Sequence, residues 1–329
     1  MEDIAKFINE LFDVNDSTFA DKTLAIFQFQ AKNNPIYSDF LHYLDISPSK
    51  ITEIADIPFL PISLFKHQQV LVSGCASNFF FESSGTTSVE RSKHYVPDID
   101  LYRNSFLKGF NQFYGDVHDI CIVALLPSYL ERKNTSLVYM CNALIQLSSN
   151  NDSGFFLNEW DKLEQVVRKN ESLGIKTLLI GVSFALLDLA EHFNMALKHT
   201  IIMETGGMKG KRKELTRAEL HEVLKRNFGL KDIHSEYGMT ELLSQAYAKQ
   251  NGIFYTPPWM KILIRDTEDP LSLIAHGKTG CINVIDLANI YSCSFIATQD
   301  LGKLQQDGGF EVLGRFDNSD VRGCNLLVE

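Results

Sequence analysis

A short segment rich in hydroxyl groups is the first part of this sequence that could do chemistry. Every residue from 83 to 88 carries a hydroxyl except Gly85, which permits a sharp turn and a close approach of the backbone to a ligand. Consecutive backbone N–H groups in such a turn form a concave anion site, and the hydroxyls add donors. A polyphosphate suits this loop, although a Ser/Thr-rich surface turn is the simpler interpretation of the loop alone.

Residues 235–241, with the sequence Ser-Glu-Tyr-Gly-Met-Thr-Glu, form a second candidate site. Gly238 permits a tight turn after a strand, and we expect a helix to begin there. Thr240 offers a hydroxyl, Glu241 a carboxylate that could hold Mg²⁺ against a phosphate, and Tyr237 a ring that could stack on a flat heterocycle. The alternative is an ordinary helix start with Thr240 as its N-cap.

Two polar segments near the C-terminus form a third candidate site. Asp300 lies in Thr-Gln-Asp-Leu-Gly and could accept hydrogen bonds from ribose hydroxyls. Arg315 lies in Gly-Arg-Phe-Asp and could reach the same sugar or a phosphate. The alternative is a pair of β-turns closed by a surface ion pair, which would contribute little to stability.

Composition and charge limit the class of protein. The chain has 329 residues, of which 45% are hydrophobic and 22% charged, as in an ordinary globular protein. The formal net charge of −10 argues against a protein that coats nucleic acid or binds anionic membranes electrostatically. Neither a signal peptide nor a run of roughly 20 apolar residues is visible, so we expect a cytoplasmic protein with no membrane insertion. The six cysteines lack the Cys-x-x-Cys spacing of a zinc site.

Short apolar runs alternate with amphipathic segments between residues 117 and 229, and a β-rich region follows from residue 253. The alternation predicts parallel strands with helices on both faces, a fold in which ligands bind at the carboxyl ends of strands. Strands are predicted at 120–126, 176–181, 200–203, 262–264, 281–285 and 291–297. Helical or amphipathic segments are predicted at 136–147, 157–168, 184–193 and 214–228.

The order and spacing of the three candidate sites resemble the adenylate-forming (acyl-activating) enzyme superfamily. Residues 83–88 look like its phosphate loop, and residues 237–241 are similar to its Tyr-Gly-x-Thr-Glu motif. Asp300 corresponds to its ribose-binding Asp, residues 314–317 to its hinge motif, and residues 205–207 to the stretch that lines the adenine site. The usual glycine of the phosphate loop is replaced at position 88 and the usual Pro-Lys at positions 90 and 91.

The resemblance implies an α/β fold. This fold is the large N-terminal domain of the superfamily, with parallel sheets flanked by helices, a β-rich subregion and no C-terminal lid domain. We therefore expect a core at residues 1–313, with sheet–helix layers to about 250 and the β-rich subregion at about 253–313. The hinge motif and a short tail would occupy residues 314–329.

Within the superfamily, the chain is most similar to the LuxE-type acyl-protein synthetases. The similarity rests on residues 127–132, 204–210 and 322–326. Members of this family activate a fatty acid as the acyl-adenylate, carry the acyl group on a cysteine near the C-terminus and pass it to a reductase. Cys324 lies where that cysteine would be, whereas without the resemblance an inert cysteine in a tail is the simpler interpretation.

The resemblance therefore implies a ligase that uses ATP and Mg²⁺ on a fatty acid, with an acyl reductase or another acyl-acceptor protein as partner. The catalytic residues that it implies are Cys324, Thr240, Glu241 and Arg315. The residues implied to bind ATP are Ser83, Ser84, Gly85, Thr86, Thr87, Ser88, Gly206, Gly207, Tyr237, Gly238 and Asp300. Glu241 would hold the Mg²⁺ through ATP, and Arg91 or Lys93 would replace the lysine of the loop. The alternatives are an acid–CoA ligase of the phenylacetate type that lacks its lid and a non-catalytic nucleotide-binding protein on the same fold.

Overall fold

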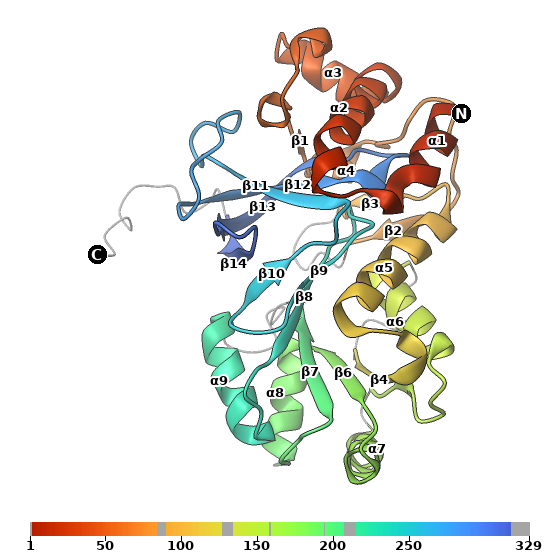
Figure 1. The fold of residues 1–329 in the computed structure, drawn as a ribbon, viewed down its shortest axis with the longest axis vertical. Coiled ribbons are helices and arrows are strands. Elements are labelled where there is room, and N and C mark those ends of the chain that lie inside the picture. Colours follow the sequence, from red (N-terminus) through yellow and green to blue (C-terminus); the bar gives the residue numbers. More distant parts are fainter. Residues whose placement is uncertain are drawn as a thin grey trace.

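The largest element of the protein is one sheet, and one half of it is parallel (Figure 1). The computed structural model describes residues 2–83, 90–126, 134–157, 159–193, 195–206 and 215–316. In order across the sheet, the parallel strands are β5 (Gly154–Phe155), β4 (Cys121–Leu125), β6 (Thr177–Val182), β7 (Thr200–Thr205) and β8 (His234–Tyr237). Every residue of β4 and β6 is buried, as expected for parallel strands with both faces covered.

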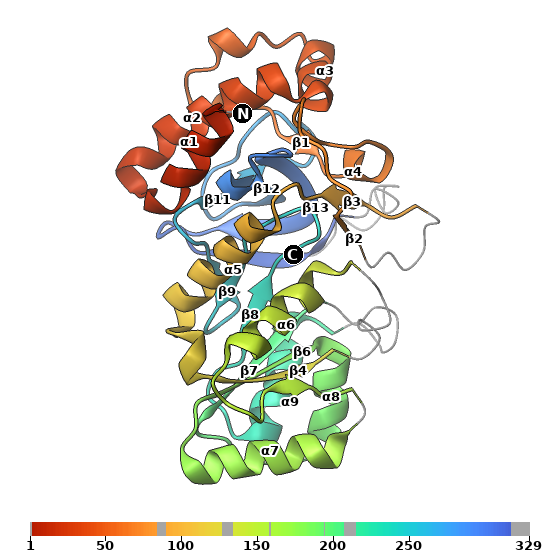
Figure 2. The same cartoon turned by 90° about the vertical axis from the view of Figure 1, so that its right-hand side faces the viewer.

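Helices cover both faces of this parallel half, as predicted (Figures 1 and 2). One face carries α5 (Ile99–Tyr114) and α6 (Ser136–Leu147), and the other carries α8 (Ser183–His192) and α9 (Arg217–Phe228); α7 (Trp160–Leu173) connects β5 to β6. The last helix of this group, α9, begins at a capping box formed by Thr216 and Glu219 and ends at Gly229, which has a φ of 63°. The glycine stop was predicted from the sequence, and the helix starts three residues later than predicted.

The second half of the sheet is antiparallel and continues from β8. In order, its strands are β9 (Ala246–Ala248), β10 (Ile253–Tyr255), β14 (Phe310–Arg315), β13 (Phe295–Leu304), β12 (Thr279–Asp286) and β11 (Met260–Arg265). The predicted β-rich region is confirmed, but the strand predicted at 291–297 begins only at Phe295. The Ser292 amide donates to the Asn289 carbonyl oxygen at 3.0 Å, so the start of this apolar run forms a turn instead of a strand.

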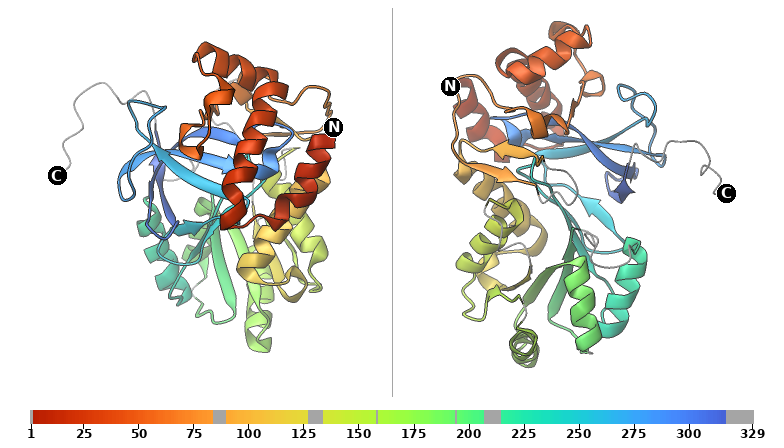
Figure 3. Two further views of the ribbon diagram at one scale, coloured as in Figure 1. Left: turned by 45° about the horizontal axis from the view of Figure 1, so that its top comes forward. Right: turned by 180° about the vertical axis from the view of Figure 1, so that it is seen from behind.

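N-terminal helices lie over the antiparallel half (Figure 3). They are α1 (Glu2–Glu10), α2 (Asp16–Asn33), α3 (Pro35–Tyr43) and the short α4 (Leu64–His67), and β1 (Leu60–Pro61) between them pairs in parallel with β13. The fully buried amide of Gln30 donates to the Asn289 carbonyl at 3.0 Å, and Asn34 donates to the Ser292 carbonyl at 2.7 Å. Short 3₁₀ helices lie at Leu11–Asp13, Pro48–Lys50, Ile54–Asp56, Val117–Asp119 and Leu287–Asn289.

A separate hairpin of β2 (Phe80–Glu82) and β3 (Lys93–Tyr95) flanks the hydroxyl-rich loop. Only Ser83 of that loop belongs to the described part of the chain. The predicted site residues Ser84, Gly85, Thr86, Thr87, Ser88, Gly207 and Cys324 lie outside it. Within the described ranges, no helix combines the length and apolar character that crossing a membrane requires.

Candidate active site

The second and third candidate sites meet where the parallel half of the sheet passes into the antiparallel half (Figure 1). The ring of Tyr237, the last residue of β8, is buried, and its hydroxyl donates to Asp300 Oδ2 at 2.8 Å. Arg315 faces Asp300 across the β13–β14 ladder, with its Nε 3.9 Å from Asp300 Oδ1. Three residues predicted separately from two distant motifs therefore form one polar cluster.

Burial shifts the pKa values of Asp300 and Tyr237 in this cluster. Burial raises the pKa of Asp300, while the hydrogen bond from Tyr237 and the charge of Arg315 lower it. Burial and the neighbouring Asp300 carboxyl also hold the pKa of Tyr237 well above its ordinary value, so this hydroxyl remains a hydrogen-bond donor. The Arg315 side chain is 81% exposed, so its ion pair adds little stability and its guanidinium is open to a ligand in the solvent.

Gly238 follows Tyr237 and lies close to the side chains of Glu236 and Gln245. A Cβ atom at this position would lie 2.4 Å from Glu236 Oε1 and 3.1 Å from Gln245 Cγ. Gly206, with a φ of 66°, follows directly after β7 as Gly238 follows β8, and its carbonyl accepts a hydrogen bond from Ser183 Oγ at 2.8 Å. Both predicted glycines thus lie at the carboxyl ends of parallel strands, where ligands bind in sheets of this type.

The segment after Gly238 is a turn that leads into β9, so the predicted helix start is wrong. The backbone N–H groups of Leu243 and Ser244 donate to Asp286 Oδ2 at 3.0 and 2.8 Å. The Leu243 N–H also lies 3.1 Å from Asn289 Oδ1, and the Ser244 hydroxyl donates to Asp286 Oδ1 at 2.6 Å. Asp286 in β12 and Asn289 in the following 3₁₀ helix thus accept these amide hydrogens. At the start of a helix, a capping side chain would have to accept them.

Glu241 lies in this turn with only 5% of its surface exposed. Burial raises the pKa of its carboxyl, and a hydrogen bond from the Ser92 hydroxyl opposes that rise. The backbone of the same residue is fixed as well, because Asn289 Nδ2 donates to the Glu241 carbonyl oxygen at 2.8 Å. The turn therefore presents a preorganised carboxylate.

Residues that follow the hydroxyl-rich loop contact this turn directly. Ser92 and Ser83 are joined by two hydrogen bonds, from Ser83 N to the Ser92 carbonyl and from Ser92 N to Ser83 Oγ, both at 3.0 Å. Two residues on, the buried His94 ring places its Nδ1 3.0 Å from the Thr240 carbonyl oxygen. Residues 92–94, where β3 begins, thereby connect Ser83 to Thr240 and Glu241.

A buried polar row that the sequence analysis did not predict lies beneath the site. Thr205, Glu236 and Tyr247 face one another across β7, β8 and β9, and Thr205 Oγ1 donates to Glu236 Oε2 at 2.5 Å. Burial raises the pKa of Glu236 to about 7, and Glu204 adds to that rise. Within the described residues, Gln245 Oε1 and the Tyr247 hydroxyl are buried without a hydrogen-bond partner.

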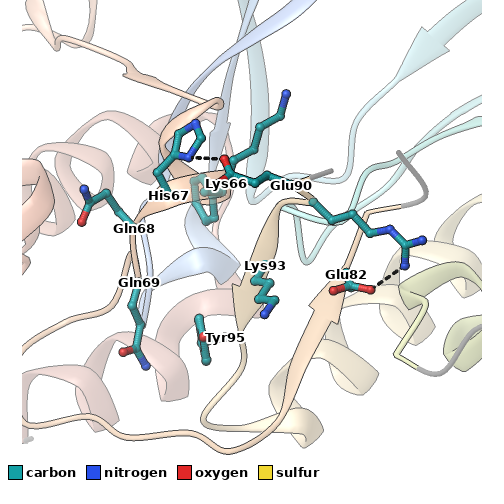
Figure 4. Close-up of a pocket in the computed structure, with 10 residues that line it drawn as sticks. Lys66, His67, Gln68, Gln69, Glu82, Glu90, Lys93 and Tyr95 are labelled. Carbon is teal, nitrogen blue, oxygen red and sulfur yellow. Dashed lines mark hydrogen bonds and ion pairs between the residues drawn. The ribbon is translucent and has the colours of Figure 1, made fainter. Parts of the chain in front are cut away.

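Two clefts lie in this part of the molecule, the larger next to the hairpin and the smaller at the end of β7, where Gly206 lines it. The larger, of about 870 Å³, lies beside the hairpin on the face opposite Phe81 and His94 (Figure 4). Its lining residues are Phe65, Lys66, His67, Gln68, Gln69, Glu82, Glu90, Arg91, Lys93 and Tyr95. The smaller, of about 200 Å³, is lined by Ser183, Glu204, Gly206, Leu215, Thr216, Arg217, Leu220, Val312, Leu313 and Gly314.

The two cations proposed to replace the loop lysine both line the larger cleft. Arg91 pairs with Glu82, with Nη1 2.9 Å from Oε2. Figure 4 shows Glu82 and the ion pair of His67 with Glu90 around this cleft. The Lys93 ammonium lies 5.1 Å from the centre of the Phe80 ring. Both cations therefore already have partners on this face of the hairpin.

The structure brings together Ser83, Tyr237, Gly238, Thr240, Glu241, Asp300 and Arg315, with Gly206 on the adjoining strand end. It adds Ser92, His94 and Glu236, which the sequence analysis missed. The sequence held a weak signal for Ser92 and His94. They stand two positions apart next to the loop, so on a strand their side chains would lie on the same face. Glu236 lies inside the predicted motif, one residue before Tyr237.

Comparison with known proteins shows the family to which the chain belongs. Residues 9–329 match the family described as acyl-protein synthetase, LuxE. The chain is 23% identical over 331 residues to the long-chain-fatty-acid–luciferin-component ligase of Aliivibrio fischeri, and the match covers 92% of this chain and 85% of that protein.

Solved structures of adenylate-forming enzymes share the fold. ATP-bound MatB from Rhodopseudomonas palustris superposes with a TM-score of 0.54 at 18% identity, covering 72% of this chain and 47% of that one. A 2-hydroxyisobutyryl-CoA ligase in the postadenylation state gives a TM-score of 0.67 at 11% identity, covering 94% and 70%. The chain thus spans about half the length of MatB, and the shared part is the large N-terminal domain that was predicted. The chain belongs to the LuxE family of acyl-protein synthetases and is a ligase.

Proposed function

We propose that this protein uses ATP to activate a long-chain fatty acid as its acyl-adenylate and then transfers the acyl group to a cysteine thiol. The observation that carries the proposal is the direct contact between two of the predicted nucleotide motifs, in which the Tyr237 hydroxyl donates to Asp300. The name of the Aliivibrio fischeri relative supports a long-chain fatty acid as the substrate.

Each group of the site has a role in the first half-reaction. The fatty carboxylate attacks the α-phosphorus of ATP, the bond to the bridging oxygen breaks, and pyrophosphate leaves. Asp300 accepts hydrogen bonds from the ribose hydroxyls, and the exposed Arg315 reaches the sugar or a phosphate. The hydroxyls of residues 83–88 and Thr240 donate to the phosphates, and the ends of β7 and β8 at Gly206 and Tyr237 hold the adenine. The protein contributes placement and charge stabilisation.

Glu241 is the residue that would hold Mg²⁺. A buried carboxylate whose pKa is raised by burial gains from a nearby cation, so this environment fits the ion. Within the described residues, no group of three His, Cys, Asp or Glu side chains could hold a metal, so the remaining ligands would be phosphate oxygens and water. When bound, the ion would neutralise phosphate charge as pyrophosphate leaves.

In the second half-reaction, the Cys324 thiolate attacks the carbonyl carbon of the acyl-adenylate. The bond from this carbon to the phosphate oxygen breaks, AMP leaves, a thioester forms, and the thiol proton passes to solvent. The acyl group then goes to an acyl reductase or another acyl-acceptor protein. The choice of Cys324 rests on the sequence resemblance.

Pyrophosphate exchange tests the activation step. The protein is incubated with fatty acids of graded length, Mg-ATP and labelled pyrophosphate, and label entering ATP is measured. We expect exchange with long-chain acids and a loss of about tenfold or more in Asp300→Ala, since a hydrogen-bonding partner of the nucleotide is removed. The matched control is Asp307→Ala, which removes an exposed Tyr–Asp hydrogen bond of the same 2.8 Å length, with Tyr255. If no acid supports exchange, the proposed activation step is wrong.

Retention of a labelled acyl group tests the transfer step. We expect labelled fatty acid and Mg-ATP to give a protein-bound label that hydroxylamine releases, and Cys324→Ser to abolish this label while exchange continues. Cys75→Ser, at a half-buried cysteine, is the control and should keep the label. A label that survives in Cys324→Ser would contradict the role of Cys324, and free acyl-CoA as the product when coenzyme A is added would favour an acid–CoA ligase.

A further inference from the structure

We infer that His94 is a positioning residue of the activation step, which holds the Thr240–Glu241 turn against the hairpin that carries the hydroxyl-rich loop. The inference rests on the proposed function and extends it to a residue outside the sequence motifs. His94 and Thr240 are 146 positions apart in the chain, so their contact joins two separate parts of the site.

The hydrogen bonds of His94 fix its tautomer. Nδ1 lies 3.0 Å from the Thr240 carbonyl oxygen, which can only accept, so Nδ1 carries the proton. Nε2 lies 2.8 Å from Ser292 Oγ and, in the neutral ring, accepts from that hydroxyl. Burial lowers the pKa of His94 to about 4, so the ring is neutral at pH 7 and orients the turn without adding charge.

Packing fixes the orientation of the imidazole. The Phe65 ring meets it edge to face at 5.6 Å between centroids, and only 1% of the His94 surface is exposed. Phe81, on the neighbouring strand β2, pairs with His94 and is also fully buried. The Nδ1–H group is therefore held in one direction by its surroundings.

A second contact from the same strand face acts on the next residue of the turn. Ser92 is two positions before His94, and its side chain interacts with the Glu241 carboxyl and lowers the pKa of that group. The amide of Ser92 also donates to the hydroxyl of Ser83, the first residue of the loop. The hairpin thus contacts two consecutive residues of the turn, the backbone of Thr240 and the side chain of Glu241. These contacts join the loop and the turn of the proposed phosphate site.

Two substitutions separate positioning from simple packing. His94→Asn keeps a donor at the place of Nδ1 and loses the contact with Ser292, whereas His94→Gln extends toward Ser292 and loses the donor to Thr240. Ser292→Ala is the matched control, because it removes the partner of Nε2 and leaves the Thr240 contact in place. Melting temperature, kcat and KM for ATP in pyrophosphate exchange, and amide hydrogen exchange of residues 238–245 are measured for each variant.

We expect His94→Gln to lower kcat by about tenfold or more with little change in the KM for ATP, since misplaced groups weaken contacts made in the transition state. Its amides at 238–245 should exchange faster. The kcat of His94→Asn and of Ser292→Ala should stay within about threefold of that of the unmodified protein, a difference no larger than the contribution of one hydrogen bond.

Wild-type kcat and unchanged amide exchange in folded His94→Gln would overturn the inference, as would an equal loss in Ser292→Ala. If His94→Gln does not fold, Ser92→Ala tests the same connection. We expect slower pyrophosphate exchange and faster amide exchange of the turn in this variant. No change in either rate would contradict the inference. If the unmodified protein supports no pyrophosphate exchange, the proposed function fails, while the amide-exchange results still decide whether His94 positions the turn.

Discussion

Glu236 is a buried carboxyl group whose protonation changes near neutral pH. Burial raises its pKa from 4.5 to about 7, against the hydrogen bond from Thr205. Between these two values the folded protein holds a proton that the unfolded chain has lost. The free energy of unfolding therefore falls as pH rises from about 4.5 to about 7 and stays reduced above this range.

Glu236→Gln should remove this pH dependence. Glutamine can accept the Thr205 hydrogen bond and has no charge to bury, so the variant should gain stability relative to the unmodified protein as pH rises. The shift sets an upper bound of about 3 kcal/mol on the gain. Urea unfolding at pH 5.5 and 8.5 measures it, with Glu222→Gln, at a side chain that is 75% exposed, as the control. If the free energy of unfolding differs between Glu236→Gln and the unmodified protein by the same amount at both pH values, the pKa of Glu236 is not raised.

The residues of the site differ in how far the sequence could predict them. Tyr237, Asp300 and Arg315 were predicted because they stand in local motifs, and the structure brings them together. Ser92 and His94 were missed because their importance comes from contacts with residues more than 140 positions away, which leave no local pattern. The loop beyond Ser83 and Cys324 stay predictions.

Whole elements were predicted best where local preference and packing agree. The helix at 136–147 has the predicted bounds, and Gly229 stops the next predicted helix by adopting the left-handed conformation. The helix expected after Gly238 does not form, because Asp286 and Asn289 accept the amide hydrogens of the segment. Those acceptors are more than 40 positions away, so the residues around the turn could not reveal them.

Asp286 is the centre of that turn, and its loss should destabilise the protein more than an ordinary substitution. Its two oxygens accept from the amides of Leu243, Ser244 and Ala288 and from the Ser244 hydroxyl. Asp286→Ala leaves the buried amides of Ser244 and Ala288 without this acceptor, while the Leu243 amide keeps only Asn289, and the change should cost roughly 3 kcal/mol or more in the free energy of unfolding.

Denaturant unfolding at pH 7 of the unmodified protein, Asp286→Ala and Asp286→Asn measures this cost. Asparagine keeps one acceptor oxygen, so Asp286→Asn should lose clearly less than Asp286→Ala. A loss below about 1 kcal/mol in Asp286→Ala would show that the turn is held by other contacts.

At the scale of the whole molecule, one continuous sheet links the helical layers to the β-rich region. We propose that residues 1–313 form the core and that residues 314–329 carry the hinge motif and the acyl-carrying cysteine. The last described strand, β14, ends at Arg315 and pairs with β10 and β13. A chain shortened after Phe316 keeps every described strand.

Such a shortened chain should fold and activate fatty acid but fail to retain it. We expect its melting temperature to stay within about 4 °C of the full chain, since no described buried group is removed. It should keep pyrophosphate exchange and lose the hydroxylamine-labile acyl label. Loss of cooperative unfolding would show that residues 317–329 belong to the core.

The hydrogen bond from Gln30 to Asn289 has a consequence for how the protein is made. The two residues are 259 positions apart, and Leu60 of β1 likewise pairs with Ile296 of β13. At about 5–20 residues per second, a ribosome needs roughly 13–50 s to supply the partners of the first helices. During that interval, the apolar side chains of α2 that pack on the antiparallel half have no partner surface, so we expect the nascent N-terminal segment to expose them until β13 has been made.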